Sequence, residues 1–313
     1  MPRKLYMETR LYNVNNRLSS LDLCERIDGW VKQGLLEDMI PCFLPSRDNP
    51  IAEDVEDVPK AIFEIDIELL RTCAGVVGYF DGPHWDAGCA FEIGCGWAWG
   101  HPINLITTDF YKWSVGDSSE TYFVSKLVQH IANVVAICDY NMKIVDFRER
   151  CNELLERTIA AFQRNLINDF GTIKPRRPPL EAAPVVYDYY LDPNFKYTES
   201  GRILLESVIS MIKSVKKSFV IGDNQGDIAT DIDRLRQSGQ AIFYSDCYEP
   251  NVDSSILHGI AYGIGRRPVI YSGSTVRYNA GGPHVGSRNV MVETSAAAIV
   301  YSLSELEALI TKK

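Results

Sequence analysis

The chain has 313 residues, of which 46% are hydrophobic and 23% are charged, and these values are ordinary for a globular protein. Its formal net charge of −9 argues against nucleic acid or another polyanion as a partner. The apolar runs are too short to span a bilayer, and the first residues lack the apolar core of a signal peptide. We therefore expect a cytoplasmic protein of one large or two smaller domains, without a membrane partner.

The first half alternates apolar runs with helical patterns, which is typical of a parallel sheet covered by helices. We predict strands at 4–7, 39–44, 74–80, 103–108 and 134–138. We predict helices at about 20–34, 57–73, 92–100, 119–133 and 146–169. This order indicates a doubly wound, flavodoxin-like unit.

A proline-rich stretch at 171–184 is interpreted as a linker between domains at 1–170 and 185–313. In the second domain we predict strands at 185–187, 219–221, 241–244 and 268–271. Helices are predicted at 199–216, 227–238 and 258–265, with Ser304 capping a last one. The predicted fold is therefore α/β, with two flavodoxin-like, doubly wound parallel-sheet units forming a pseudo-dimer.

Cysteines are numerous but contain no C-x-x-C pair: they stand at positions 24, 42, 73, 89, 95, 138, 151 and 247. Several lie in apolar runs, so buried thiols in a reducing compartment are favoured over disulfides or a metal site. The sequence predicts neither a bound metal nor a cofactor.

The two halves resemble each other in sequence. The segment 92–102 aligns with 258–268, and a proline lies ten positions after the first residue in each. Each segment is preceded by two aspartates twenty positions apart: Asp66 and Asp86, then Asp233 and Asp253. We interpret this as a diverged duplication, with chance similarity between βα units as the alternative.

The two halves differ at the positions of candidate catalytic and binding residues. In this alignment Glu92 stands where the second half has His258. The second half has Asn289 after its last loop, and the first half shows no clear counterpart of it. We interpret each half as retaining what the other has lost, which predicts one working site in the chain.

Two carboxylates, Asp86 and Glu92, bracket the turn after the apolar run 74–80, and Asp66 lies on the preceding helix. Open α/β sheets bind ligands at the carboxyl ends of their strands, so these acids are candidates for a site. Each also has a structural interpretation. Asp86 could cap a helix, Glu92 could lie at a helix N-terminus, and Asp66 could belong to a solvated face.

The spacing of Asp66, Asp86, Gly88 and Glu92 resembles that of the nucleoside 2-deoxyribosyltransferase family. In that family a helix aspartate lies twenty residues before the aspartate of a D-x-G-x-x-x-E turn. The family's later N-L-M motif, donated by a neighbouring subunit, resembles Asn289-Val290-Met291. The resemblance covers most of residues 4–110 and, more weakly, about 185–310.

The resemblance implies a role for each acid. Glu92 would be the nucleophile that forms a glycosyl-enzyme ester at the anomeric carbon. Asp66 would assist protonation of the departing base, and Asp86 would hold the base or the sugar. Asn289 would bind the 5′ end of the sugar.

Further substrate contacts implied by the resemblance involve Gly88, Met291, Tyr6 and Tyr12, of which the two tyrosines would line the base pocket. The family usually has a small or glycine-rich turn after the first strand, whereas this chain has Glu8-Thr9-Arg10. Arg10 at that position would favour a phosphorylated donor.

An N-glycosidic bond cleaves through an oxocarbenium-like state, which requires a carboxylate at the anomeric carbon and a protonated group at the base. A covalent ester divides the reaction into two displacements. The predicted function is therefore 2-deoxyribosyl transfer between bases, with a nucleoside or nucleotide and a free base as partners. A nucleoside or nucleotide N-glycosidase and a non-catalytic nucleotide-binding module are the alternatives, and the oligomeric state stays open.

Overall fold

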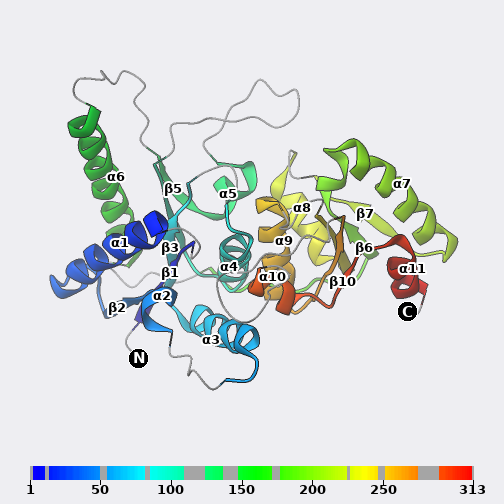
Figure 1. Cartoon of the computed structure of the whole chain (residues 1–313), viewed down its shortest axis with the longest axis horizontal. Coiled ribbons are helices and arrows are strands. Elements are labelled where there is room, and N and C mark those ends of the chain that lie inside the picture. The colour runs from blue at the N-terminus through cyan, green and yellow to red at the C-terminus, as the bar shows by residue number, and fades with distance from the viewer. Residues whose placement is uncertain are drawn as a thin grey trace. The chain divides into compact units, whose positions relative to one another are not determined.

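The computed structural model describes residues 3–10, 14–49, 55–81, 85–108, 124–136, 147–170, 177–223, 226–245, 251–273 and 289–311. By internal contacts the chain divides into two compact units (Figure 1). The first unit comprises Met1–Ala52, Ile65–Trp85 and Gly100–Pro178. The second unit comprises Glu53–Glu64, Asp86–Trp99 and Pro179–Lys313. The domain boundary that the sequence suggests at 171–184 stays a prediction.

The first unit is built on a five-stranded parallel sheet with the order β2-β1-β3-β4-β5. Its strands are β1 (Arg3–Glu8), β2 (Met39–Phe43), β3 (Gly75–Tyr79), β4 (Ile103–Thr107) and β5 (Asn133–Ala136). Strands β3 and β4 are buried along almost their whole length, as expected where both faces of a parallel sheet are covered.

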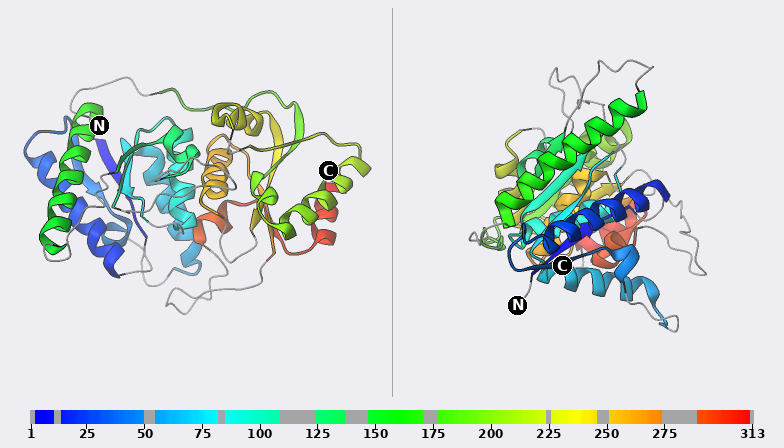
Figure 2. Two further views of the ribbon diagram at one scale, coloured as in Figure 1. Left: turned by 90° about the horizontal axis from the view of Figure 1, so that it is seen from above. Right: turned by 90° about the vertical axis from the view of Figure 1, so that its left-hand side faces the viewer.

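Helices α1 (Val14–Lys32) and α6 (Phe147–Phe170) lie side by side against this sheet (Figure 2). Their apolar side chains form one core with those of the strands: Leu23, Ile27, Phe162 and Leu166 with Met7, Val77 and Ile106. Three further helices belong wholly or partly to this unit: α2 (Pro45–Asp48), α3 (Val58–Thr72) and α5 (Lys126–Ile131).

The second unit also has a five-stranded parallel sheet, with the order β10-β9-β8-β6-β7. The strands are β6 (Tyr187–Leu191), β7 (Phe219–Ile221), β8 (Ser238–Ser245), β9 (Val269–Ser272) and β10 (Ala298–Val300). Helix α4 (Ala87–Ala98) belongs to this unit. Its helices after β6 are η2 (Pro193–Lys196), α7 (Glu199–Ser214), α8 (Ile228–Arg236), α9 (Val252–Gly263), α10 (Val290–Ser295) and α11 (Leu303–Thr311). Helices α7 and α11 share a core with the sheet through Leu205, Val208, Leu306 and Ile310.

Read from β7, the second sheet has the order β7-β6-β8-β9-β10, which is the order of the first sheet. The prediction of two doubly wound parallel-sheet units is therefore confirmed. The shared topology supports the interpretation as a duplication, which stays a prediction, as does the pseudo-dimer.

Helix α4 (Ala87–Ala98) begins five residues before the predicted start at 92. The cause is Asp86, whose Oδ1 accepts the N–H groups of Gly88 at 2.8 Å and Cys89 at 3.2 Å. Helix α9 likewise begins at Val252 and not at 258, because Asn251 caps it. Small residues in the first turn of each helix hid both starts in the sequence pattern.

Other elements differ from the sequence prediction in the second unit. Strand β6 lies at Tyr187–Leu191, two residues beyond the predicted start, because it pairs with both β7 and β8 there. The segment after Asn289 is the helix α10, capped by the Asn289 side chain. Strand β10 has no counterpart in the prediction.

The helix caps also correct the alignment of the halves. Both α4 and α9 have 12 residues, and each is followed by a glycine with positive φ, Gly100 at 83° and Gly265 at 82°. Counted from the caps, the position of Glu92 corresponds to Leu257 and not to His258. The connection from Gly265 to β9 is one residue longer than that from Gly100 to β4, which explains the shift in the sequence alignment.

The strand pairing also changes which aspartate of the second half is equivalent to Asp66. Tyr6 lies opposite Val76, and Tyr190 lies opposite Ala241. Asp66 precedes Val76 by ten positions, and Asp231 precedes Ala241 by ten (76 − 66 and 241 − 231). Asp231 is buried and accepts the Tyr190 hydroxyl, so it is the structural counterpart of Asp66 in place of Asp233.

A counterpart of Asn289 exists after all. Helix α5 lies between β4 and β5 as α10 lies between β9 and β10, and both have 6 residues. The cap of α5 is Ser125, whose hydroxyl accepts the N–H of Val128. The first half therefore retains the element and has a different cap residue.

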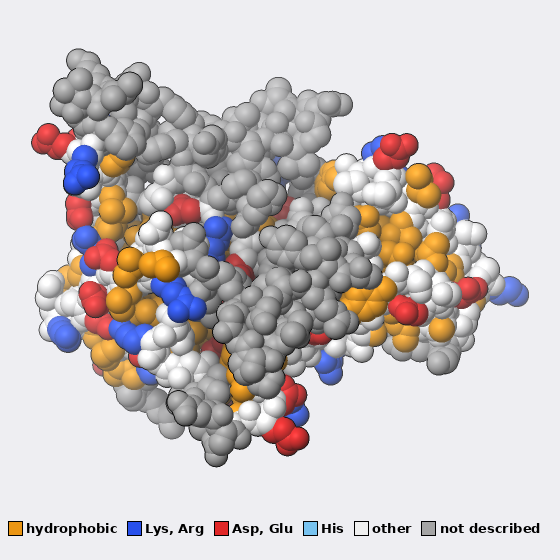
Figure 3. Space-filling model, in the orientation of Figure 1, with side chains coloured by type: hydrophobic (Ala, Val, Ile, Leu, Met, Phe, Trp, Pro, Cys, Tyr) orange, Lys and Arg blue, Asp and Glu red, His pale blue; other side chains and the backbone are white. Residues whose placement is uncertain are grey.

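Five described cysteines are buried thiols and Cys151 is half-buried, while Cys138 and Cys247 lie outside the described residues. Among the described helices, none has the length and apolar character that crossing a membrane requires. On the face drawn in Figure 3, acidic and basic side chains are interspersed over the described residues.

Candidate active site

The start of α4 carries the first group of candidate residues. Oδ1 of Asp86 holds two N–H groups of the first turn and also accepts the Nδ2 of Asn289 at 2.9 Å. The two residues are 203 positions apart and belong to the second unit. The capping interpretation of Asp86 is therefore correct, and the cap at the same time orients Asn289.

The position of Asn289 is fixed by contacts at both ends of helix α10. Its Oδ1 accepts the N–H of Met291 at 3.0 Å, so the amide has a defined orientation and the side chain is 5% exposed. The other end of α10 is bound by Arg267, whose guanidinium donates to the carbonyls of Thr294, Ser295 and Ala296 at 2.7–3.0 Å. Arginine near the last turn satisfies carbonyls that the helix leaves open.

Gly88 makes the contact between Asp86 and Asn289 feasible. A Cβ atom at Gly88 would collide with the amide group of Asn289. The glycine of the D-x-G-x-x-x-E pattern is thus required here by the close approach of a side chain from α10.

Glu92 lies in the middle of α4 and is only 6% exposed. The interpretation as a glutamate at a helix N-terminus is wrong, because α4 begins five residues earlier. A buried carboxylate is costly for a fold, and such groups are typical of functional positions.

Asp66 belongs to the first unit and is 4% exposed, so the solvated-face interpretation is also wrong. Burial raises the pKa of Asp66 to about 7, because the charged carboxylate is removed from water. Its Oδ1 accepts the Nδ2 of Asn49 at 3.3 Å. A carboxyl with this pKa holds a proton close to neutral pH, as a general acid must.

Residues 21–154 match the family model described as nucleoside 2-deoxyribosyltransferase. The resemblance is confirmed for this segment. No curated protein matches the chain at a significant level. The segment of this chain that matches the family model contains Asp66, Asp86, Gly88 and Glu92. Asn289 lies beyond that segment.

The structure brings together four of the residues that the resemblance selects: Asp86, Gly88, Asn289 and Met291. Tyr6 is fully buried in β1, with its ring centroid 5.7 Å from that of Phe43. Tyr12 lies outside the described residues. The placement of Asp66 relative to Glu92 stays a prediction, because the two residues belong to different units.

Asn49, which contacts Asp66, and Arg267, which contacts the end of α10, were not predicted from the sequence. Asn49 follows β2 at the carboxyl edge of the sheet, and that position was a usable signal. Arg267 had no signal in the sequence, since its partners are backbone carbonyls 27–29 positions away.

A separate cavity of about 680 Å³ lies in the first unit between α1 and α6. Tyr79, Asp81, Thr108, Arg26 and Glu156 are among its lining residues. The cavity contains none of the acids of the deoxyribosyltransferase pattern. Among the described residues no cluster of His, Cys, Asp and Glu side chains is arranged to hold a metal ion.

Proposed function

We propose that the chain transfers a 2-deoxyribosyl group between bases through a covalent intermediate on Glu92. The observation that carries this proposal is the hydrogen bond from Asn289 to Asp86. It joins the Asn-x-Met element to the D-x-G-x-x-x-E helix, and the two bonded residues lie 203 positions apart in the sequence. The match of residues 21–154 to the family supports the reaction class.

In the first displacement a carboxylate oxygen of Glu92 bonds to the anomeric carbon as the bond from that carbon to the base nitrogen breaks. The electron pair of the broken bond stays on the base, and Asp66 supplies the proton. In the second displacement a nitrogen of the incoming base attacks the anomeric carbon, the ester bond breaks, and Asp66 recovers a proton. The burial that raises the pKa of Asp66 supports this role.

The helix α4 and its cap would serve the sugar. Asp86 and Asn289 form one hydrogen-bonded pair, so a change at either affects the orientation of the other. We assign this pair to the hydroxyl groups of the sugar, where paired donors and acceptors give orientation.

Incubation of a deoxynucleoside with a second free base tests the proposal, with the swapped nucleoside as product. Wild-type protein is expected to form it, and Glu92→Gln to lose at least about 100-fold in rate, because the amide is a poor nucleophile. Glu206→Gln, an exposed glutamate in α7, is the matched control and is expected to keep full rate.

Exchange at the wild-type rate in Glu92→Gln would contradict the proposal. Release of free base without a swapped nucleoside would assign the chain as a hydrolase that uses the same acids. Ligand binding without turnover in the wild-type protein would identify a non-catalytic binding module.

A further inference from the structure

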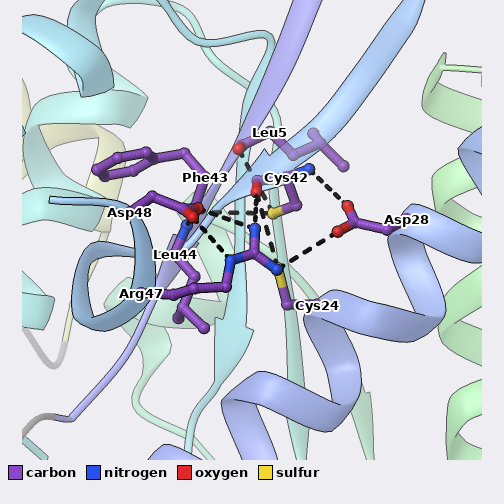
Figure 4. Close-up of polar contacts among 8 residues, drawn as sticks. All are labelled: Leu5, Cys24, Asp28, Cys42, Phe43, Leu44, Arg47 and Asp48. Atoms are coloured by element: carbon purple, nitrogen blue, oxygen red, sulfur yellow. Dashed lines mark hydrogen bonds and ion pairs between the residues drawn. The ribbon is translucent and has the colours of Figure 1, made fainter.

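The turn after β2 is held by a network around Arg47 (Figure 4). Nε and Nη2 of Arg47 donate to the two carboxylate oxygens of Asp48 at 2.7 and 2.8 Å. Nη2 also donates to the carbonyl of Cys42 at 2.7 Å. Bidentate arginine–carboxylate pairs impose geometry, so the network binds α2 to the end of β2.

A second set of contacts ties the same turn to α1. Asp28 accepts the N–H of Cys42 at 2.7 Å and Nη1 of Arg47 at 3.4 Å. Oδ2 of Asp48 accepts the N–H of Leu44 at 2.9 Å. The side chains of Arg47 and Asp48 are 32% and 31% exposed, so the network contributes through geometry more than through energy.

Asn49 follows this turn directly and contacts Asp66. Its N–H donates to the carbonyl of Pro45 at 3.2 Å, which continues the last turn of α2. Its Nδ2 donates to Oδ1 of Asp66 at 3.3 Å. Its own Oδ1 is buried and accepts no hydrogen bond from the part of the chain that the structure describes. This bond therefore connects the Asp66 carboxyl to a turn whose backbone is held by Arg47 and Asp48.

We propose that Asn49 is a positioning residue that holds the Asp66 carboxyl in one orientation for proton transfer. The assignment rests on the proposed role of Asp66 in glycosyl transfer. At 3.3 Å the bond is longer than the usual 2.7–3.2 Å for N–H···O. It is too weak to offset burial, which is why the pKa of Asp66 stays raised to about 7. A long bond from a fixed turn orients the carboxyl and leaves its proton available.

Three substitutions of Asn49 test this assignment. In Asn49→Asp a second carboxylate faces Asp66, and the titration midpoint of Asp66 is expected to move up by about one pH unit. Asn49→Ala is expected to lower kcat about ten-fold with KM changed less than about two-fold, because the carboxyl loses its orientation. Asn49→Gln retains an amide donor and is expected to recover most of kcat.

The measurements are the ¹³C titration of the Asp66 carboxyl, which needs no turnover, and the pH profile of base exchange. Ser46→Ala is the matched control: Ser46 is an exposed residue of the same turn, and both measurements should be unchanged. Thermal unfolding of each variant shows whether the fold is retained.

An unchanged Asp66 midpoint in Asn49→Asp would overturn the assignment, as would full kcat in Asn49→Ala. If Asn49→Ala does not fold, the titration of Asn49→Asp and the recovery in Asn49→Gln decide between the same two results. Failure of the proposed function is distinguishable: Glu92→Gln would retain exchange, while the Asp66 titration would still report on its contact with Asn49.

Discussion

Asp66, the proposed proton donor, also affects the stability of the protein. Its carboxyl is 4% exposed, and burial raises its pKa to about 7, against about 4 in an unfolded chain. Between these two values the native state holds a proton that the unfolded state releases. The stability of the protein therefore falls as the pH rises through this window, and the whole cost is present above pH 7.

Asp66→Asn removes this cost and keeps the shape of the side chain. We expect its free energy of unfolding, relative to wild type, to rise by on the order of 2 kcal/mol between pH 5 and pH 8. Base exchange should fall by about 100-fold or more, since the proposed proton donor is lost. Urea unfolding at the two pH values is the measurement, and an equal difference at both would show that Asp66 is not desolvated in the native state.

At the scale of elements, α4 and α9 are packed through glycines at equivalent positions. A Cβ at Gly94 would overlap the carbonyl of Ile256, and a Cβ at Gly259 would overlap the carbonyl of Phe91. Counted from the caps, Gly94 corresponds to Gly259 and Phe91 corresponds to Ile256, so the two contacts are equivalent. A reciprocal contact of this kind is what a two-fold relation between similar elements produces.

The substitutions Gly94→Ala and Gly259→Ala should therefore destabilise the protein to a similar extent. We expect about 2 kcal/mol for each, or a melting temperature lowered by about 4–8 °C, because the added methyl group forces the helices apart. Gly29→Ala in α1 is the matched control, since a Cβ there meets nothing within 4 Å. It should leave the melting temperature unchanged or raise it slightly. If Gly94→Ala unfolds at the same temperature as Gly29→Ala, the close packing is wrong.

At the scale of the whole molecule, the corrected alignment supports a single site per chain. The positions of Glu92, Asp86 and Asn289 are occupied in the other half by Leu257, Asn251 and Ser125. Leucine cannot form an ester, so the second set of positions lacks a nucleophile whatever else it retains. Asp231 keeps the place of Asp66 and is engaged by the Tyr190 hydroxyl.

The carboxyl edge of the second sheet is also filled by its own side chains. Asp192, directly after β6, is fully buried and accepts the Ser254 hydroxyl at 2.5 Å and the N–H groups of Asn194 and Tyr244 at 3.0 Å. Burial raises its pKa to about 6 even though these bonds lower it. A carboxylate satisfied in this way supports the structure of the edge.

We therefore expect one glycosyl group per chain when the protein is mixed with a deoxynucleoside and no acceptor base. Intact-mass measurement after rapid quenching should show a single added deoxyribosyl group in the wild-type protein. Asp231→Asn should keep that stoichiometry, and Glu92→Gln should show no addition. Two groups per chain would contradict the assignment of the second half as lacking a nucleophile.

The class of fold and the resemblance to the deoxyribosyltransferase family could both be predicted from the sequence. Alternating apolar runs and helical patterns depend on local periodicity, and they predicted two parallel sheets whose strand orders agree. The spacing of Asp66, Asp86, Gly88 and Glu92 is a linear property, and the family match over residues 21–154 contains all four. The starts of α4 and α9 were harder to predict, because the caps Asp86 and Asn251 precede turns of mostly small residues with little apolar periodicity.

The environment of these residues depends on contacts between segments that lie far apart in the sequence. The contact of Asn289 with Asp86 spans 203 positions, and the burial that raises the pKa of Asp66 depends on segments packed around it. The equivalence of the positions of Leu257 and Glu92 could be found only from the helix caps, because a single extra residue before β9 shifts the linear alignment. Long-range contacts and desolvation arise from how distant segments pack, and a linear spacing does not contain them.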